Sequence, residues 1–95
     1  MKGYIVCVYK SISSEEKLKD YALKARAAVE KYEGKFLIRG GKTKTNEGED
    51  SPRTVVLEFA SYDEANLFYN SKEYQDAHKI LKGHAIRHHQ TIEGA

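Results

Sequence analysis

The chain has 95 residues, which fits one domain, and 40% of them are hydrophobic, which is enough for a core. Seven Tyr and three Phe argue against a disordered chain, although 32% of the residues are charged. Sixteen Lys and Arg against fourteen Asp and Glu leave a formal net charge of +2, too small to indicate nucleic-acid binding from charge alone.

The first segment predicts a strand followed by a helix. Residues 3–9 are almost all β-branched or aromatic, as in a strand covered on both faces. Ser13 and Glu16 have the spacing of a capping box, so we expect the helix to begin there. Gly34 is in position to end it with a left-handed cap. One apolar stripe at helical spacing lies between them: Leu18, Tyr21, Ala22, Ala25, Ala28, Val29 and Tyr32.

The middle of the chain predicts two strands joined by a polar connection. Residues 35–39 form a short strand that ends at the flexible pair Gly40-Gly41. Residues 43–50 are polar and indicate a loop, with an extension of the strands as the alternative. Pro52 then opens a strand over residues 53–59, at a position where no ladder donor is needed.

The last third predicts an interrupted helix and a final strand. Ser61 and Glu64 repeat the capping-box spacing before an apolar stripe that ends at Tyr69. Asn70-Ser71 interrupts the helix, and helical spacing resumes over residues 74–81. Gly83 precedes a strand over residues 85–93, in which the alternation of polar and apolar residues is weak.

This order predicts a single α+β domain over residues 1–95 with a ferredoxin-like βαββαβ sandwich. Right-handed crossovers place both helices on one face of a four-stranded antiparallel sheet. Val and Ile occupy both alternation phases of the strands at residues 3–9 and 53–59, so the other face also needs cover. A chain of this length obtains that cover from a second copy, which predicts a homodimer.

Several stretches together resemble a family of domains of unknown function, numbered 1330. They are Lys2 to Tyr4, Phe36 to Gly41, Arg53 to Phe59, Tyr69 to Gln75 and Glu93-Gly94. The resemblance implies a dimeric α+β barrel, in which two ferredoxin-like sheets face each other, and it implies no common activity. Relatives carry Pro at the position of Lys72 and often Arg at that of His88, so an anion-binding role of His88 would depend on pH.

The positions that match the family are the candidate ligand-binding residues Arg39, Arg53, Tyr69 and Tyr74, together with Glu58. Arg39 follows a strand and precedes two glycines, so its guanidinium could bind a carboxylate there. An ion pair with Glu58 on the neighbouring strand is the alternative, and both can hold. Tyr69 and Tyr74 flank the helix break, which suits either a core position or hydroxyls that reach a pocket.

The four histidines do not predict a metal site. His84 and His88 would lie roughly 13 Å apart along one strand, and His89 points to the opposite face from His88. Cys7 in a central strand is interpreted as an inert buried thiol. The remaining basic residues near the C-terminus are interpreted as a solvated surface or a subunit contact: Lys79, Lys82, His84, Arg87, His88 and His89.

Other partners are not expected. The element order is similar to that of an RNA-recognition motif, but the central positions Val55 and Leu57 are apolar where that module needs exposed aromatic rings, so we expect no nucleic-acid partner. No apolar run is long enough to cross a bilayer, which predicts no membrane partner. The single cysteine and the absence of a signal-like segment before the first strand predict a cytoplasmic protein.

These observations predict a small-molecule site in the cleft between helices and sheet. Its ligand would be an anionic or carbonyl-containing metabolite held by Arg39, His88 and Tyr69. Any catalysis would use His88 and Glu58 as acid–base groups, without a cofactor, since no phosphate loop or dinucleotide motif is present. The alternative is a dimeric binding or interaction module with no enzymatic activity.

Overall fold

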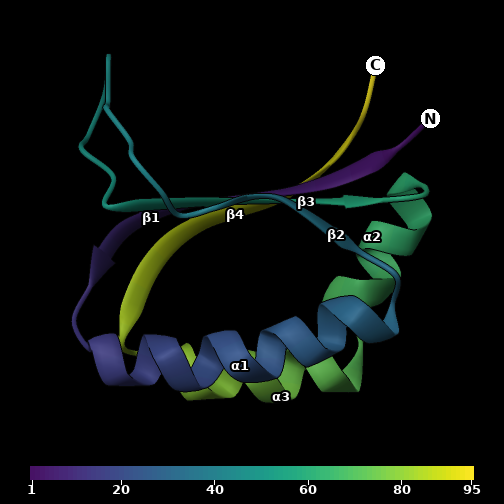
Figure 1. Ribbon diagram of the computed structural model, residues 1–95, viewed down its shortest axis with the longest axis horizontal. Helices are drawn as coiled ribbons and strands as arrows, with labels where there is room; N and C mark the ends of the chain where they lie inside the picture. The colour runs from purple at the N-terminus through teal and green to yellow at the C-terminus, as the bar shows by residue number, and fades with distance from the viewer.

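The computed structural model describes residues 1–95 as one antiparallel sheet with helices on a single face (Figure 1). The elements in chain order are β1 (Gly3–Ile12), α1 (Glu15–Lys31), β2 (Lys35–Arg39), β3 (Arg53–Phe59), α2 (Tyr62–Tyr69), α3 (Lys72–Leu81) and β4 (Ala85–Glu93). The predicted ferredoxin-like fold is confirmed, including the break between α2 and α3. Residues 40–52 form no strand, so the connection between β2 and β3 is a loop.

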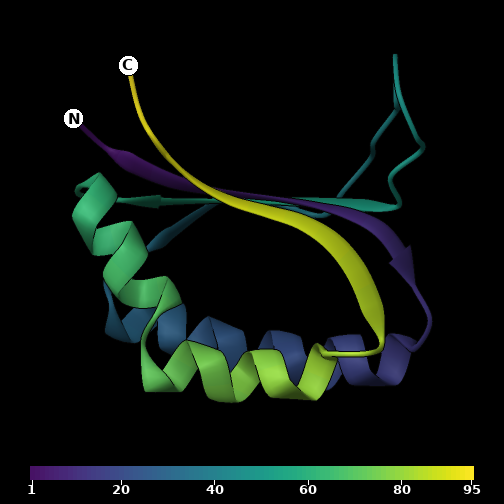
Figure 2. The same cartoon turned by 180° about the vertical axis from the view of Figure 1, so that it is seen from behind.

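The strands lie in the order β2-β3-β1-β4, with antiparallel pairing throughout. Helices α1 and α3 run side by side beneath the sheet, and α2 descends from one end of the sheet to α3 (Figures 1 and 2). The β2–β3 loop and both chain termini project on the side away from the helices. None of the helices is both long enough and apolar enough to cross a bilayer.

The core lies between the sheet and the helices. In β1 every second residue, Ile5, Cys7 and Tyr9, points into it, and β3 contributes Leu57 and Phe59. The helices contribute the apolar faces that the periodicity predicts: Leu18, Tyr21, Ala25, Ala28, Val29, Ala65, Phe68, Tyr74, Ala77 and Leu81. These residues form one continuous cluster from five elements, and the partly buried Phe36 of β2 and Ala85 of β4 pack against it.

A register shift bends the sheet toward the helices at one end. The β1–β4 pairing passes from Tyr9↔Arg87 to Ser11↔Ile86, which leaves Lys10 as an extra residue in β1. Beyond this point β1 and β4 curve down toward the start of α1 and the end of α3 (Figure 2). The arch keeps α1 at a distance from the middle of the sheet.

At each end of α1, the residue that caps the helix differs by one position from the residue that we predicted. The N-cap of α1 is Ser14, whose Oγ accepts a hydrogen bond from the backbone N–H of Lys17 at 3.2 Å, and not Ser13. The left-handed residue after α1 is Glu33, with φ 57°, and not Gly34. Gly34 is needed for space, because a Cβ there would lie 2.7 Å from the ring of Phe59.

The second face of the sheet carries no helix and is called the open face here. Its central side chains are Val6 and Val8 of β1 and Val56 of β3, and on the outer strands Ile38 is 47% and Ile92 46% exposed. Val55 and Leu57, which we expected on this face, have the opposite phase and point to the helices. The centre of the open face is therefore aliphatic, as predicted, but the residues that form it are not the ones that we predicted.

Candidate functional site

A cavity of about 340 Å³ lies between α1 and the helix-facing side of the sheet. Fourteen of its twenty lining residues are hydrophobic. The sheet supplies Ile5, Val55 and Leu57, and α1 supplies Leu18 and Val29. A cavity of this size with mainly apolar walls and a few polar groups suits a small organic ligand.

The charged residues around this cavity are all cations. Every one of the four arginines of the chain lines it: Arg26, Arg39, Arg53 and Arg87. Of the twelve lysines only Lys19 does, and none of the fourteen Asp and Glu side chains does. Arg26 pairs with the exposed Glu30 at 3.3 Å, whereas the three arginines of the sheet form no salt bridge. The cavity thus holds positive charge without a carboxylate to offset it.

Arg87 is the centre of a polar cluster in the wall of the cavity. Its Nη1 donates to Tyr21 Oη at 3.1 Å and its Nη2 to Tyr74 Oη at 3.2 Å. The two hydroxyls lie 2.9 Å apart, and His89 Nε2 lies 3.4 Å from Tyr74 Oη. Arg87 Nη1 also lies 3.5 Å from Cys7 Sγ. We call Tyr21, Tyr74, Arg87 and His89 the polar cluster.

The partners of Arg87 are neutral. Burial raises the pKa of Tyr21 well above its usual value and also raises that of Tyr74, so both phenols keep their protons. Burial likewise raises the pKa of the Cys7 thiol, against the opposing effect of Arg87. Burial alone would lower the pKa of Arg87, but the surrounding hydroxyl and thiol groups favour the cation, and the net shift is upward.

His89 is held in its neutral form. Burial and the positive charge of Arg87 lower its pKa from 6.5 to about 3. Its ring packs on that of Tyr69, with centroids 5.0 Å apart, and near that of Tyr74 at 6.0 Å. An uncharged imidazole with one nitrogen near a buried hydroxyl can accept or donate a hydrogen bond there.

Arg53 of β3 and Arg39 of β2 line the cavity from the strands on the other side of β1 from Arg87. Arg53 stands 5.9 Å from the centroid of the Tyr9 ring, and its buried Nε has no hydrogen-bond partner. Gly40 has a φ of 71°, which favours glycine. A Cβ there would approach Arg53 Nη1 to 2.7 Å, so the guanidinium would have to shift to admit a larger residue. Arg39 lies over the ring of Phe36 at 4.4 Å. The segment Arg39 to Gly41 therefore contributes Arg39 to the cavity wall and lies beside the guanidinium of Arg53.

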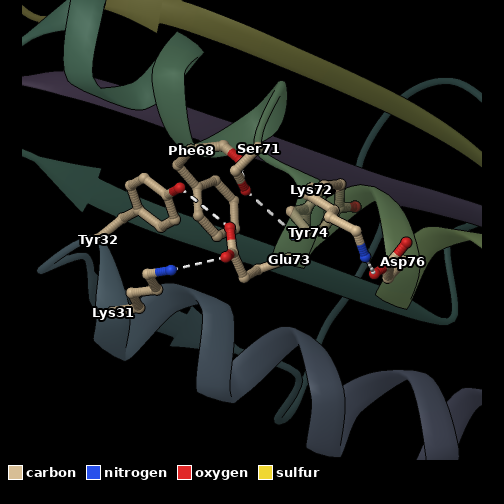
Figure 3. A network of polar contacts seen from close by, with 8 residues as sticks. All are labelled: Lys31, Tyr32, Phe68, Ser71, Lys72, Glu73, Tyr74 and Asp76. Atoms are coloured by element: carbon tan, nitrogen blue, oxygen red, sulfur yellow. Dashed lines mark hydrogen bonds and ion pairs between the residues drawn. The ribbon is translucent and has the colours of Figure 1, made fainter.

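The break between α2 and α3 places Tyr74 in the cavity. Ser71 Oγ accepts from the N–H of Tyr74 at 3.1 Å and donates to the carbonyl of Phe68 at 2.6 Å, which caps α3 and closes the end of α2 (Figure 3). The Gln75 side chain donates to the carbonyl of Tyr69 at 2.6 Å across the same break. These bonds fix the direction in which the Tyr74 ring leaves α3.

Glu73 ties this break to α1. Its carboxylate accepts from Lys31 Nζ at 2.6 Å and from Tyr32 Oη at 3.0 Å (Figure 3). Lys31, the backbone N–H of Glu73 and Tyr32 together lower the pKa of this carboxyl to about 2. The family-matching segment Tyr69 to Gln75 thus has a structural role, because it docks α3 on α1 beside the cavity.

The structure brings only part of the predicted site together. Arg39, Arg53 and Tyr74 line the cavity, and Tyr69 packs behind Tyr74 with ring centroids 5.3 Å apart. Glu58 lies on the open face, where it accepts a hydrogen bond from Tyr4 Oη at 3.1 Å. The alternative ion pair between Glu58 and Arg39 does not form, because Arg39 lies opposite Val55 and faces the helices.

His88 is also separated from the cavity. It pairs with Val8 on the open face, where its Nε2 lies 3.2 Å from Gln90 Oε1. The expected cleft that joins His88 to Arg39 is therefore not present within one chain, because strand alternation sends the two side chains to opposite sides of the sheet.

Arg87 and His89 are the site residues that the sequence interpretation missed. We expected them on a solvated surface or at a subunit contact, but they pair with Tyr9 and Cys7 on the core-facing side of β1. The signal was the weak alternation of the last strand, in which Arg87, His89 and Thr91 occupy one phase. Polar residues on the phase that faces a core indicate a functional cavity. No group of three His, Cys, Asp or Glu side chains is arranged to hold a metal ion.

Comparisons with known proteins agree with the fold. The family model described as "Domain of unknown function (DUF1330)" matches residues 2–95. No curated protein matches the chain. Among solved structures, a protein of unknown function from Rhodopseudomonas palustris is similar with a TM-score of 0.77 and 12% identity, over 99% of this chain and 82% of that one.

Two further structures are similar. One is a dimeric protein of unknown function and ferredoxin-like fold from Bacteroides fragilis, with a TM-score of 0.64 and 20% identity over 98% of this chain and 96% of that one. The other is SnoaB, a cofactor-independent oxygenase from Streptomyces nogalater, with a TM-score of 0.67 and 7% identity over 99% and 93%. At these identities the similarity shows the fold alone.

Proposed function

The chain belongs to the DUF1330 family, and on that basis we propose that it is a homodimeric protein that binds a small organic anion with an apolar body. The observation that carries the proposal is the charge of the cavity: every arginine of the chain lines it and no carboxylate does. Two of these arginines, Arg53 and Arg87, are partly buried and form no salt bridge, whereas Arg26 and Arg39 are exposed. Charges withdrawn from solvent are normally paired in proteins, so Arg53 and Arg87 indicate a counter-ion that is not part of the chain.

The two parts of the cavity suit the two parts of such a ligand. The apolar walls from Ile5, Leu18, Val29, Val55 and Leu57 favour a hydrocarbon or aromatic body. The arginines favour a planar carboxylate or a related oxyanion, because a guanidinium presents two parallel N–H donors to it.

Free donors are available for the anionic group. Arg53 donates no side-chain hydrogen bond within the protein, and Arg87 donates only to two hydroxyls and a thiol. Buried polar groups without a partner are uncommon in folded proteins and point to an acceptor supplied by solvent or ligand. The proposed ligand set is therefore Arg39, Arg53, Arg87 and Tyr74.

We expect the wild-type protein to bind 2-naphthoate more tightly than its neutral analogue 2-naphthamide, as measured by isothermal titration calorimetry. The two compounds have nearly the same apolar body, so the difference reports the charge. Hydrogen bonds to charged groups contribute about 1.5–3 kcal/mol, so Arg87→Gln should weaken naphthoate binding about tenfold or more.

Lys72→Gln is the matched control, because Lys72 is a cation whose side chain is 84% exposed and lies outside the cavity. It should leave naphthoate binding unchanged. Equal binding of naphthoate and naphthamide would contradict an anion site. Absence of binding by both compounds and by smaller carboxylates such as benzoate would favour the alternative, a dimeric interaction module.

The open face supports the homodimer. Val6, Val8 and Val56 form an aliphatic centre that no helix of the chain covers. Exposed Ile38 and Ile92 extend it to the outer strands. A large exposed apolar face on a small protein indicates an interaction surface, and a sheet face that packs on its own copy is self-complementary. The similar Bacteroides fragilis protein is described as dimeric.

We expect Val56→Asp to convert the dimer to a monomer, as measured by light scattering coupled to gel filtration. Val56 lies between Val6 and Ile38, so a carboxylate there would be buried without a partner in the dimer. Leu67→Asp is the control, because Leu67 is 61% exposed on α2 and should leave the mass unchanged. A wild-type mass of one chain at micromolar concentration would contradict the homodimer.

The roles predicted for Glu58, His88 and Tyr69 change with this proposal. Glu58 and His88 lie on the open face, so any acid–base role for them would be exercised at the subunit interface and not in the cavity. Tyr69 contributes by supporting the rings of Tyr74 and His89. A cytoplasmic location remains the expectation from the single cysteine.

A further inference from the structure

The polar cluster gives the anion site a second property, which rests on the proposed function. We propose that the cavity takes up its organic anion together with a proton, and that His89 holds this proton. The argument rests on the hydrogen-bond chain that joins His89 to the cavity and on the charges that face its ring.

A chain of hydrogen bonds connects the cavity to His89 through two hydroxyls, and each hydroxyl has a single hydrogen to donate. Tyr21 Oη lies 2.9 Å from Tyr74 Oη, and Tyr74 Oη lies 3.4 Å from His89 Nε2. Arg87 donates to both hydroxyls and accepts from neither. The direction of the chain is therefore set by what its two ends donate or accept.

An anion in the cavity sets this direction. If its oxygen accepts the hydrogen of Tyr21, the oxygen of Tyr21 is free to accept from Tyr74, and the oxygen of Tyr74 is then free to accept from His89 Nε2. The chain thus ends on an N–H of His89. A protonated imidazole always provides that N–H, so the bound anion and the proton on His89 stabilise each other.

The charges around His89 act in the same direction. The groups that face its ring are Arg87 of β4, Cys7 of β1, Tyr69 of α2, and Tyr74 and His78 of α3. His88, the neighbouring residue of β4, points to the open face but also lowers the pKa of His89. None of them is a carboxylate. Burial and Arg87 therefore oppose the imidazolium, and the pKa of His89 is about 3. An anion beside Arg87 offsets that positive charge and raises this pKa toward neutrality.

His78 is the other histidine near the cluster. Its ring stacks on that of Tyr74 with centroids 6.1 Å apart, but neither of its ring nitrogens bonds a member of the cluster, and it does not line the cavity. His89 does both. His89 is therefore the acceptor that the geometry favours, and His78 is the group that an experiment must distinguish from it.

The test uses 2-naphthalenesulfonate, which stays anionic at every pH at which the protein is folded. A proton taken up on binding must then go to the protein. Titration calorimetry at about pH 6 in MES and in imidazole buffer, which differ in heat of ionisation, should show net proton uptake. Affinity should rise as the pH falls from about 7 to 5, approaching about tenfold per pH unit if the pKa of His89 in the complex lies above this range.

His89→Gln should still bind the sulfonate but without proton uptake and with an affinity that varies little with pH. His78→Gln should keep both effects. If wild type binds the sulfonate with no proton uptake, the assignment of His89 is overturned while the anion site stands. If uptake survives in His89→Gln and is lost in His78→Gln, the proton resides on His78 and the assignment is also overturned.

A measurement on the unaltered protein covers the case in which His89→Gln does not fold. The ring resonances of His89 are identifiable by their proximity to Tyr69 and Tyr74, and their titration by NMR reports the pKa directly. The expected result is an upward shift of this pKa on addition of sulfonate. An unchanged titration of His89 with the site saturated would overturn the proposal, and failure of any sulfonate or carboxylate to bind would overturn it together with the anion site.

Discussion

Phe68→Ala is expected to lower the free energy of unfolding by about 3–5 kcal/mol, the usual cost of removing a buried aromatic ring. Phe68 is fully buried, and its ring lies 5.0 Å from that of Phe59, 4.9 Å from that of Tyr74 and 6.3 Å from that of Tyr32. It thus joins β3, α3 and α1 at the point where α2 ends. The ring also lines the cavity, so its removal would enlarge the cavity and leave its neighbours without contacts.

The measurement is urea denaturation at a fixed protomer concentration, because the stability of a dimer depends on concentration. Leu67→Ala is the control: it removes a side chain of similar size from the preceding position of α2, where 61% is exposed. This change should cost less than about 1 kcal/mol. Equal losses for Phe68→Ala and Leu67→Ala would mean that the core is not centred on the end of α2.

Acid is expected to destabilise the protein as soon as the pH falls below about 6.5. The unfolded chain protonates His89 near 6.5, whereas the folded protein does so only near 3. The stability associated with neutral His89 is therefore fully present above the unfolded pKa and is lost as the pH falls toward 3. At 1.36 kcal/mol per pKa unit, the free energy of unfolding should decrease by about 2 kcal/mol between pH 7 and pH 5.

Denaturation of the wild type, His89→Gln and His88→Gln across this range checks the prediction. His88 lies on the opposite side of the same strand, so His88→Gln should retain the acid dependence and His89→Gln should lose most of it. Burial also lowers the pKa of His78, so a smaller dependence in the same direction should remain in His89→Gln. Saturating naphthalenesulfonate should reduce the loss in the wild type. A profile of His89→Gln that matches the wild type would contradict a buried neutral imidazole.

The sequence predicted a large part of the fold because local signals were strong. The apolar stripe of α1, the cap at Ser61, the break at Asn70-Ser71 and the turn at Gly83 each depend on neighbouring residues, and the structure has all four. The predictions that failed were those of helix caps, where two adjacent residues could each take the capping position. Ser13 and Ser14 both can cap a helix, and the choice depends on Ser13 being bonded to the carbonyl of His84, far along the chain.

For the site, the sequence indicated the residue types but not their positions relative to the sheet. Arg39, Arg53 and Tyr74 line the cavity between helices and sheet, whereas Glu58 and His88, which we predicted for the same site, lie on the open face. A strand alternates between two faces, and which phase faces the helices is decided by pairing with β1. That register is a property of residues far apart in the chain, from 44 positions for Tyr9 and Arg53 to 56 positions for Gly3 and Phe59.

Length, composition and periodicity by themselves therefore determined an α+β domain with the element order βαββαβ. They also indicated that the second face of its sheet is apolar. Only the tertiary structure decided that all four arginines surround one cavity, that Arg87 and His89 point inward, and that no carboxylate accompanies them. The physical reason is that secondary structure follows from interactions within a few residues, while the charge of a cavity is the sum over strands and helices that meet only after the sheet has assembled and bent.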